Sequence, residues 1–377
     1  MRELQFIRTG RLEWRERPDP VLRDPRDAIV RPFVAARCDG DTLPIHRHVS
    51  RAMQLGMRTG LIDPIVASIC GPVPFRGPFG IGHEAIAEVI ETGPEVTSLR
   101  RGDRVVVPWA ISCGSCLECT RGLTAKCSTT RTSTLAAFGF GPASGQWGGM
   151  VADALRIPYA DHMLVKLPPG LDPLRVAAAS DNLADAWRCV VPPLAQRPGG
   201  SVLVLAGAAQ SIGLYAAGLA VANGATVDYV DHRPERLEIA EKLGATVHPT
   251  AGKGRLRASD IPGRRYDIAV EATSTAAGVD LALRALAPGG YCTPVGYYLP
   301  PGTKVPLMHM YANDATLHIS VSHVRPVLPD LLDFIARTDF PAEHVTTLLA
   351  DWDDAPHAYT SRTTKLVLHR PPLDATT

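Results

Sequence analysis

The chain lacks several features that would place it in a special class of protein. Its 39 basic and 38 acidic residues leave a formal net charge of +1 at pH 7, so charge gives no reason to expect a nucleic-acid or anionic-membrane partner. No apolar run reaches the roughly 20 residues that a membrane-spanning helix needs, and residues 1–10 lack the apolar segment of a signal peptide. We therefore expect a cytoplasmic protein.

What the sequence does contain is the composition of an ordinary globular protein. Of its 377 residues, 45% are hydrophobic and 20% are charged, which is typical of a chain that buries a sizeable core. A chain of this length predicts two or three domains.

Half of the eight cysteines are concentrated in one short segment, residues 113–127. Cys113, Cys116, Cys119 and Cys127 follow the spacing C-x2-C-x2-C-x7-C, which lets four thiolates surround one Zn²⁺. Disulfides would need an oxidising compartment. The ferredoxin run continues x3-C-P, whereas here the last gap is seven residues. We predict a structural zinc site in this segment, which we call the cysteine lobe.

The first part of the chain has the pattern of short β-strands separated by Gly and Pro residues, which is typical of a compact β-rich domain. The expected strands are 28–34, 85–92, 104–107 and 163–167. A Gly-His-Glu motif occupies residues 82–84, and a Gly-Asp-x-Val motif occupies residues 102–105.

The middle of the chain has the pattern of a nucleotide-binding βαβ unit. An apolar strand at 202–207 is followed by a turn of small residues, a helix at 212–222 and a second strand at 226–231. Later strands are expected at 266–272, 291–295 and 317–321, and helices at 235–243 and 277–286. The pattern predicts a Rossmann-type domain.

A helix N-terminus after a buried strand offers N–H groups to a pyrophosphate. Gly207 and Gly213 are six residues apart, so the loop departs from the usual G-x-G-x-x-G spacing. The predicted contacts of this loop are Gly207, Ala208, Ser211, Ile212 and Gly213.

Asp231 ends the second strand of this unit, where an acid accepts hydrogen bonds from the adenosine ribose and repels a 2′-phosphate. This favours NAD over NADP, although Arg233 keeps NADP as the lesser alternative. Asp231 could instead cap the helix that Pro234 begins.

Taken together, the 82–84 motif, the 102–105 motif and the cysteine lobe resemble the zinc-dependent medium-chain dehydrogenase/reductase superfamily, alcohol dehydrogenase type. The resemblance covers essentially the whole chain. It implies an α/β fold with a GroES-like β-rich catalytic domain at 1–165 and 324–377. A Rossmann domain with a doubly wound parallel sheet is implied at 166–323. We further expect a homodimer or homotetramer.

The resemblance also implies a catalytic zinc held by Cys38, His83 and Asp181. Glu84 would stand behind the metal as an alternate ligand, and Asp41 would accept the second N–H of the ligand histidine. Other interpretations remain open from the residues alone. Cys38 and His83 could be ordinary buried residues, Asp181 a helix cap, Glu84 a buried structural carboxylate and Asp41 a solvated loop residue.

The resemblance also implies residues that contact the cofactor. Lys365 resembles a basic residue that meets the pyrophosphate, and a solvated lysine is its alternative. Arg236, Ala272 and Val295 are further candidate cofactor contacts.

Three features depart from the family pattern. Gly40 stands where the family has the Ser or Thr that starts a proton relay, so Thr42, His46, His48 or water would have to replace it. Asp185 stands where the family often has a threonine against the nicotinamide. The segment between Cys38 and His83 is longer than the family's usual length, with an insert at residues 44–78. Within it, residues 48–69 could form an amphipathic helical insert. This insert could line the substrate pocket, form an oligomer contact or be a surface elaboration.

The expected reaction is hydride transfer between a small alcohol, aldehyde or ketone and NAD(H), with two zinc ions per chain. Two alternatives remain. One is an aldehyde dismutase that keeps NAD tightly bound, suggested by an aspartate as third ligand. The other is a non-redox binding protein on the same scaffold, suggested by Gly40, Asp185 and the altered phosphate loop.

Overall fold

The computed structural model describes residues 1–251 and 256–373, which form two compact units. The first unit comprises Met1–Ala184, Ser322–Ala336 and Thr346–Thr377. The second comprises Asp185–Val321 and Arg337–Val345. The domain limits expected from the sequence, 165/166 and 323/324, stay a prediction. Among the described residues, no helix is both long and apolar enough to cross a bilayer.

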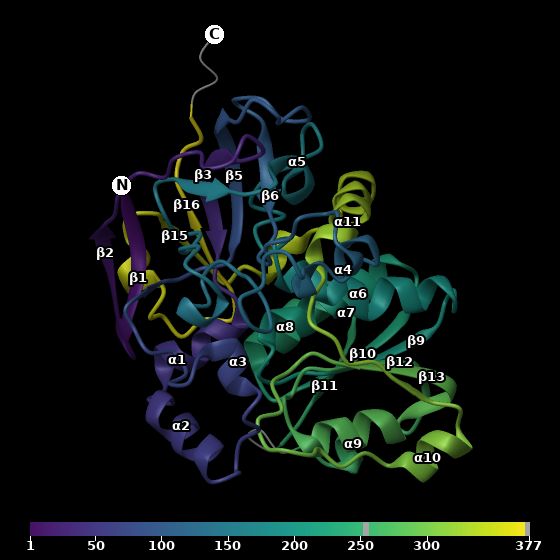
Figure 1. Ribbon diagram of the computed structural model, residues 1–377. Coiled ribbons are helices and arrows are strands. Elements are labelled where there is room, and N and C mark those ends of the chain that lie inside the picture. The colour runs from purple at the N-terminus through teal and green to yellow at the C-terminus, as the bar shows by residue number, and fades with distance from the viewer. Residues whose placement is uncertain (252–255, 374–377) are drawn as a thin grey trace. The chain divides into compact units, whose positions relative to one another are not determined.

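A mostly antiparallel sheet forms the centre of the first unit (Figure 1). Its strands run in the order β15-β16-β3-β5-β6-β8, and β7 also pairs with β3. Their bounds are β3 Ala28–Ala36, β5 Glu84–Thr92, β6 Arg104–Val107, β7 Leu155–Ile157, β8 Val165–Lys166, β15 Leu348–Asp351 and β16 Leu366–His369. β3 and β5 lie inside this sheet, and they are buried along most of their length because hydrophobic clusters pack against their side chains.

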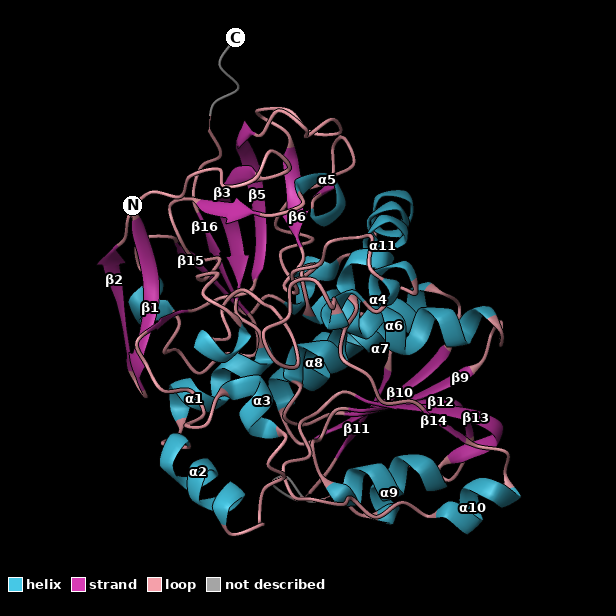
Figure 2. Cartoon of the chain, viewed as in Figure 1, coloured by secondary structure: helices cyan, strands magenta, loops and turns pink. Residues whose placement is uncertain are grey.

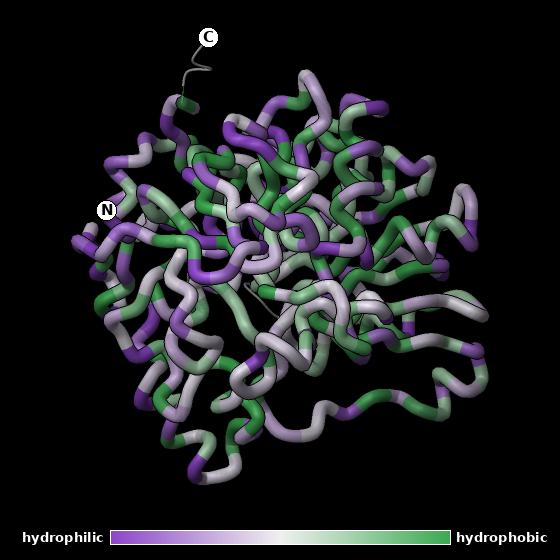
Figure 3. Tube along the Cα trace, turned by 45° about the horizontal axis from the view of Figure 1, so that its top comes forward, coloured by the Kyte–Doolittle hydropathy of each residue, from purple (hydrophilic) through white to green (hydrophobic). Residues whose placement is uncertain are grey.

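A smaller sheet at the N-terminus was not predicted from the sequence. It has the order β2-β1-β4, with β1 at Arg2–Arg8, β2 at Arg11–Glu16 and β4 at Phe79–Gly80. Arg11–Glu16 is rich in charged residues, so its apolar content is too low to read as a buried strand. Figure 3 shows the resulting hydrophilic residues beside the N-terminus.

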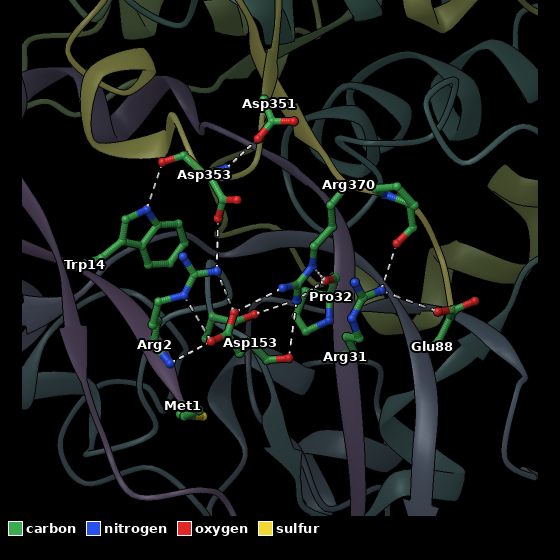
Figure 4. Close-up of polar contacts among 12 residues, drawn as sticks. Met1, Arg2, Trp14, Arg31, Pro32, Glu88, Asp153, Asp351, Asp353 and Arg370 are labelled. Carbon is green, nitrogen blue, oxygen red and sulfur yellow. Dashed lines mark hydrogen bonds and ion pairs between the residues drawn. The ribbon is translucent and has the colours of Figure 1, made fainter. Parts of the chain in front are cut away.

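The end of the chain returns to the first unit and is fixed there by a charged network (Figure 4). Asp153 accepts from Arg2 Nε at 3.3 Å and from Arg370 Nη1 at 3.1 Å. The Arg370 guanidinium also lies 4.2 Å from the centroid of the Trp352 ring. β16 pairs with β3, and this pairing places Lys365, which directly precedes β16, next to the end of the strand that precedes Cys38.

The predicted insert between Cys38 and His83 is helical, and it forms three short helices. They are α1 Thr42–His46, α2 Ser50–Arg58 and α3 Val66–Cys70. Met53 and Val66 face inward, whereas Leu55, Leu61 and Ile65 are exposed. The other helices of this unit are α4 Leu117–Thr120, α5 Ala160–Met163, α11 Val324–Thr338 and α12 Ala355–Ala358.

The second unit is a parallel six-stranded sheet covered by helices on both faces, as predicted (Figure 2). The order is β11-β10-β9-β12-β13-β14. The strands are β9 Ser201–Leu205, β10 Thr226–Asp231, β11 Thr246–Pro249, β12 Tyr266–Glu271, β13 Leu286–Pro294 and β14 Thr316–Leu317. The helices are α6 Asn182–Ala195, α7 Gln210–Ala222, α8 Pro234–Lys242, α9 Ala276–Arg284 and α10 Leu307–Ala312.

Two strand predictions differ in detail from the structure. The segment expected as a strand at 163–167 begins with the end of α5, because Tyr159 adopts a left-handed conformation (φ 50°) and starts a helical turn at Ala160. The last Rossmann strand, expected at 317–321, is limited to Thr316–Leu317.

Candidate metal centres and cofactor site

The cysteine lobe brings its four sulfurs together, and all eight cysteines of the chain are free thiols. The Sγ atoms of Cys113, Cys116, Cys119 and Cys127 lie within 4.8 Å of one another. Gly114 and Gly122 have positive φ (81° and 79°), which lets the chain turn around the sulfurs. The grouping matches the ligand set of a structural zinc site.

The thiols of the lobe are held by hydrogen-bond donors of the same segment. The amides of Cys113 and Cys116 donate to the sulfurs of Cys127 and Cys113, each at 3.4 Å. Burial alone would raise the pKa of Cys113, but its hydrogen bonds with Thr129, Ser115 and Cys116 lower it to about 6. A low thiol pKa favours the thiolate that a metal requires.

A second group, which we call the Cys38 site, consists of Cys38, His83 and Asp181. Asp181 Oδ2 lies 3.1 Å from Cys38 Sγ and 3.4 Å from His83 Nε2. The pairing of β3 with β5 brings two of them together: Ala36 lies opposite Glu84, so Cys38 and His83 leave neighbouring strand ends. Asp181 comes from the turn before α6.

The imidazole of His83 is buried, with 2% of its side chain exposed, and neither ring nitrogen has a hydrogen-bond partner in the structure. Leaving such nitrogens unsatisfied is costly in a protein interior. A cation bound between Nε2, Cys38 Sγ and Asp181 Oδ2 would give Nε2 a partner. The donor set of thiolate, imidazole and carboxylate fits Zn²⁺.

The electrostatics of the Cys38 site also favour a cation. Burial, followed by the charge of Asp181, raises the pKa of Cys38 well above its ordinary value. Burial would lower the pKa of His83, but the carboxylates of Asp41 and Asp181 outweigh it and raise the pKa to about 9. Both groups therefore retain protons that a bound metal would displace.

The two acids predicted to support the metal occupy different positions. Asp41 Oδ1 lies 3.9 Å from His83 Nδ1, on the side predicted, but too far for a hydrogen bond. Glu84 is fully buried and is not among the three residues whose ligand atoms converge. Its carboxylate pairs with Lys365 and accepts the backbone N–H of Asn182 at 2.8 Å. Burial raises the pKa of Glu84 to about 7.

The structure places Lys365 differently from the predicted pyrophosphate contact, and it is not a solvated lysine either. Its side chain is fully buried. Nζ donates to Glu84 Oε2 at 2.5 Å, to Asn182 Oδ1 at 2.8 Å and to the Arg37 carbonyl at 3.1 Å. Because an ammonium has three hydrogens, these acceptors use all of them and leave none for a phosphate.

Asn182 was not predicted from the sequence as a site residue. Its side-chain amide touches both Cys38 and Asp181, yet asparagine after an aspartate belongs to no metal-site motif. Only its position beside Asp181 could have drawn attention to it.

The proposed replacements for the missing relay hydroxyl are placed as follows. Thr42 Oγ1 donates to the Asp39 carbonyl at 2.6 Å, and His48 is exposed. His46 Nε2 is buried without a partner. Gly40 contacts the site through its backbone, since its N–H donates to Cys38 Sγ with a nitrogen-to-sulfur distance of 3.3 Å.

An aromatic side chain lies against the ligand histidine. The Phe140 ring centroid is 4.5 Å from that of His83 and 5.3 Å from that of Trp109. The loop that carries Phe140 is tied to the insert, because Thr134 Oγ1 donates to Ser68 Oγ at 2.5 Å. This bond joins the insert to the loop that carries Phe140, and a role of the insert in lining the substrate pocket stays a prediction.

The second unit holds the predicted nucleotide-binding residues at the carboxyl ends of its strands. A Cβ on Gly207 would lie 2.5 Å from the Cα of Thr273, so only glycine fits there. Ala208 and Ala209 lead into α7, where Ser211, Ile212 and Gly213 form the first turn; Ala209 has no side chain that could cap this helix. Ala272 and Val295 directly follow β12 and β13.

Asp231 is buried and bound by a salt bridge. Arg236 Nε lies 2.7 Å from Asp231 Oδ2, and Arg236 Nη1 donates to the Gly207 carbonyl at 3.0 Å. Asp231 Oδ1 accepts the backbone N–H groups of His232 and Arg233. Asp231 is the last residue of β10 and does not cap α8, whose N-cap is Arg233.

Asp185 occupies the position where a threonine was expected against the nicotinamide. It forms an ion pair with Arg188, with Nε 2.5 Å from Oδ1, and Arg188 Nη2 donates to the Ser320 carbonyl at 3.1 Å. A charged pair thus replaces the small hydroxyl at this place in the second unit.

Comparison with known proteins agrees with this architecture. Residues 24–169 match the alcohol dehydrogenase GroES-like domain, and residues 211–337 match the zinc-binding dehydrogenase domain. The solved alcohol dehydrogenase TADH from Thermus sp. ATN1 is 30% identical with a TM-score of 0.80, covering 98% of this chain and 99% of that one.

Curated relatives show the same likeness. A probable zinc-binding alcohol dehydrogenase of Mycobacterium tuberculosis is 28% identical over 95% of this chain and 84% of its own length. A glutathione-independent formaldehyde dehydrogenase of Pseudomonas aeruginosa is 30% identical over 65% of this chain and 58% of its own.

The fold and these matches define a zinc-dependent oxidoreductase of the alcohol dehydrogenase type. The chain belongs to the zinc-dependent medium-chain dehydrogenase/reductase superfamily. The alternative of a non-redox binding protein was placed on this same scaffold, so membership in the family leaves it a prediction.

Proposed function

We propose that the protein transfers a hydride between a small alcohol and a nicotinamide cofactor, forming an aldehyde or ketone, or the reverse. The observation that carries this proposal is the Cys38 site, where a thiol, an imidazole without hydrogen bonds and a carboxylate converge within 4.8 Å. Zinc bound there would supply Lewis acidity toward the substrate oxygen.

The chain's own residues hold and shape this site. Cys38 and Asp181 bring two negative charges when deprotonated, which balance a divalent cation. His83 adds a neutral donor, and its orientation is restricted by the Phe140 ring on one side and by Asp41 near Nδ1. Phe140 and Trp109 offer apolar surface to the carbon skeleton of a substrate.

For the cofactor we propose NAD in preference to NADP, bound by the second unit. Asp231 lies at the carboxyl end of β10, next to the Gly207 turn, where the adenosine ribose lies in Rossmann domains. Arg236 holds its carboxylate in place. Arg233, whose side chain is 57% exposed, is the residue that would favour NADP.

A second candidate is aldehyde dismutation, in which NAD stays bound between an oxidation and a reduction. Asp181 as third ligand and the likeness to the formaldehyde dehydrogenase favour it. The two reactions differ in one property, since a dismutase converts aldehyde to equal amounts of alcohol and acid with no change in free NADH.

The proposal is tested by screening alcohols, aldehydes and ketones with NAD(H) and NADP(H) while following the nicotinamide absorbance. A substrate-dependent change that is lost in Cys38→Ser supports the dehydrogenase. Product formation from aldehyde without an absorbance change supports the dismutase. Turnover that Cys38→Ser leaves unchanged would contradict both.

A further inference from the structure

Asn182 connects two ligands of the Cys38 site to the buried pair Lys365–Glu84. Only 1% of the residue is exposed. Its Nδ2 donates to Cys38 Sγ at 3.3 Å and to Asp181 Oδ2 at 3.1 Å. Both hydrogens of the Asn182 amide therefore have an acceptor, and both acceptors belong to predicted metal ligands.

The orientation of the Asn182 amide is fixed by what surrounds it. Oδ1 accepts from Lys365 Nζ at 2.8 Å and from the Asp39 N–H at 3.2 Å. A flipped amide would direct its NH₂ group at these two donors and its oxygen at Cys38 and Asp181. Because an ammonium cannot accept a hydrogen bond, only the observed orientation satisfies all four contacts.

We propose that Asn182 is a positioning residue of the zinc site, which donates to the Cys38 thiolate and keeps Asp181 Oδ2 directed at the metal. This inference rests on the proposed function, since it requires a metal in the Cys38 site. Lys365 and Glu84 act through Asn182: the ammonium holds the amide oxygen, and Glu84 Oε1 holds the backbone N–H of the same residue.

The hydrogen bonds from Asn182 would have one effect on the Cys38 thiolate and another on the Asp181 carboxylate. An N–H donor draws charge away from the sulfur, so the sulfur gives less charge to the metal and leaves it a stronger Lewis acid. A donor on Asp181 Oδ2 fixes the carboxylate in one rotamer, as partners of metal ligands commonly do. Gly40 N–H donates to the same sulfur at 3.3 Å, so Cys38 receives two donors.

A purely structural role would affect different properties. Asn182 Oδ1 also joins the start of α6 to the Asp39 N–H and to Lys365 Nζ, and losing these bonds would lower stability with or without metal. Ser180 provides the matched control: it is equally buried and exchanges two hydrogen bonds with the backbone of Ala85.

The test uses the full chain with cobalt(II) in the Cys38 site and zinc kept in the cysteine lobe. Subtracting the absorption spectrum of Cys38→Ser from that of the protein with Cys38 isolates the charge-transfer band from the Cys38 thiolate to cobalt. In Asn182→Ala the sulfur lone pair loses a donor, so the band should move to lower energy. Affinity for the metal, measured by chelator competition, should fall by about tenfold or more. Ser180→Ala should lower the melting temperature and leave both readouts unchanged.

Asn182→Ser keeps a hydroxyl at the start of α6 and supplies the measurement if the alanine variant does not fold. An unchanged band and unchanged metal affinity in the folded variant would overturn the proposal while leaving the metal site intact. A wild-type spectrum that Cys38→Ser does not alter would overturn the metal site itself, and with it this role of Asn182.

Discussion

Arg236 and Asp231 form a buried ion pair at the end of β10, with Nε 2.7 Å from Oδ2 and Nη2 2.8 Å from Oδ1. The acid expected to select the cofactor is therefore fixed in place before any cofactor binds. Such preorganisation reduces the entropy lost on binding. Breaking the pair by removing one partner leaves a buried charge unpaired, which is strongly destabilising.

Asp231→Asn should reduce the preference for NAD over NADP by about tenfold or more, because it removes the repulsion of a 2′-phosphate and a charged hydrogen-bond acceptor. Dissociation constants for both nucleotides measure this. Asp228→Asn is the matched control, since Asp228 lies in the same strand and pairs with Arg264 at 2.6 Å. It should lower stability without changing the preference. A wild type that binds NADP more tightly would contradict the assignment to Asp231.

Cys116→Ser should remove one zinc ion and lower the free energy of unfolding by several kcal/mol, on the order expected when a structural zinc is lost. Elemental analysis and thermal unfolding measure both effects. Cys70→Ser is the control, because Cys70 lies at the end of α3 and outside both ligand groups. It should keep the full zinc content.

Glu271→Gln should stabilise the protein at pH 8 and leave it nearly unchanged at pH 4. Burial raises the pKa of Glu271 to about 7, above its ordinary value of 4.5. Between these values the folded state binds more protons than the unfolded state, so wild-type stability falls as the pH rises through this range. The loss is at most about 3.4 kcal/mol, since one pKa unit corresponds to about 1.4 kcal/mol.

Denaturant unfolding of wild type and Glu271→Gln at several pH values tests this. The protonated carboxyl can donate to Tyr298, whose hydroxyl contacts Oε2, and glutamine preserves a donor there. Parallel pH profiles for the two proteins would contradict a raised pKa of Glu271 in the folded state.

Thr134→Val should raise the KM for substrates several-fold while kcat and zinc content stay close to wild type. The valine keeps the shape of the side chain but removes the hydroxyl bond to Ser68, so the loop that carries Phe140 is held less firmly. Thr59→Val is the control within the insert, since its hydroxyl bonds only to carbonyls of α2. Equal KM values for the two variants would show that the bond between Thr134 and Ser68 does not affect substrate binding.

The sequence allowed the Rossmann unit, the cysteine lobe and the Cys38–His83–Asp181 set to be predicted, because each follows from spacing or from a family motif. Asn182 and the partners of Lys365 could not be predicted. They depend on β16 returning beside β3, a pairing between residues more than 300 positions apart. The β1–β2 hairpin was missed because the apolar residues of β2 are too few to indicate a buried strand.

The Asp181→Ala variant tests the central claim most directly, with zinc stoichiometry and melting temperature measured on one sample. Asp161→Ala is the control, because Asp161 accepts only from Thr97 and Ser98 and touches neither ligand group. We predict one remaining zinc in the cysteine lobe and no turnover for Asp181→Ala, against two zinc ions for the control. If Asp181 only capped a helix, its loss would cost about 1 kcal/mol of stability and leave the metal in place. Two full equivalents of zinc with normal activity would contradict the assignment.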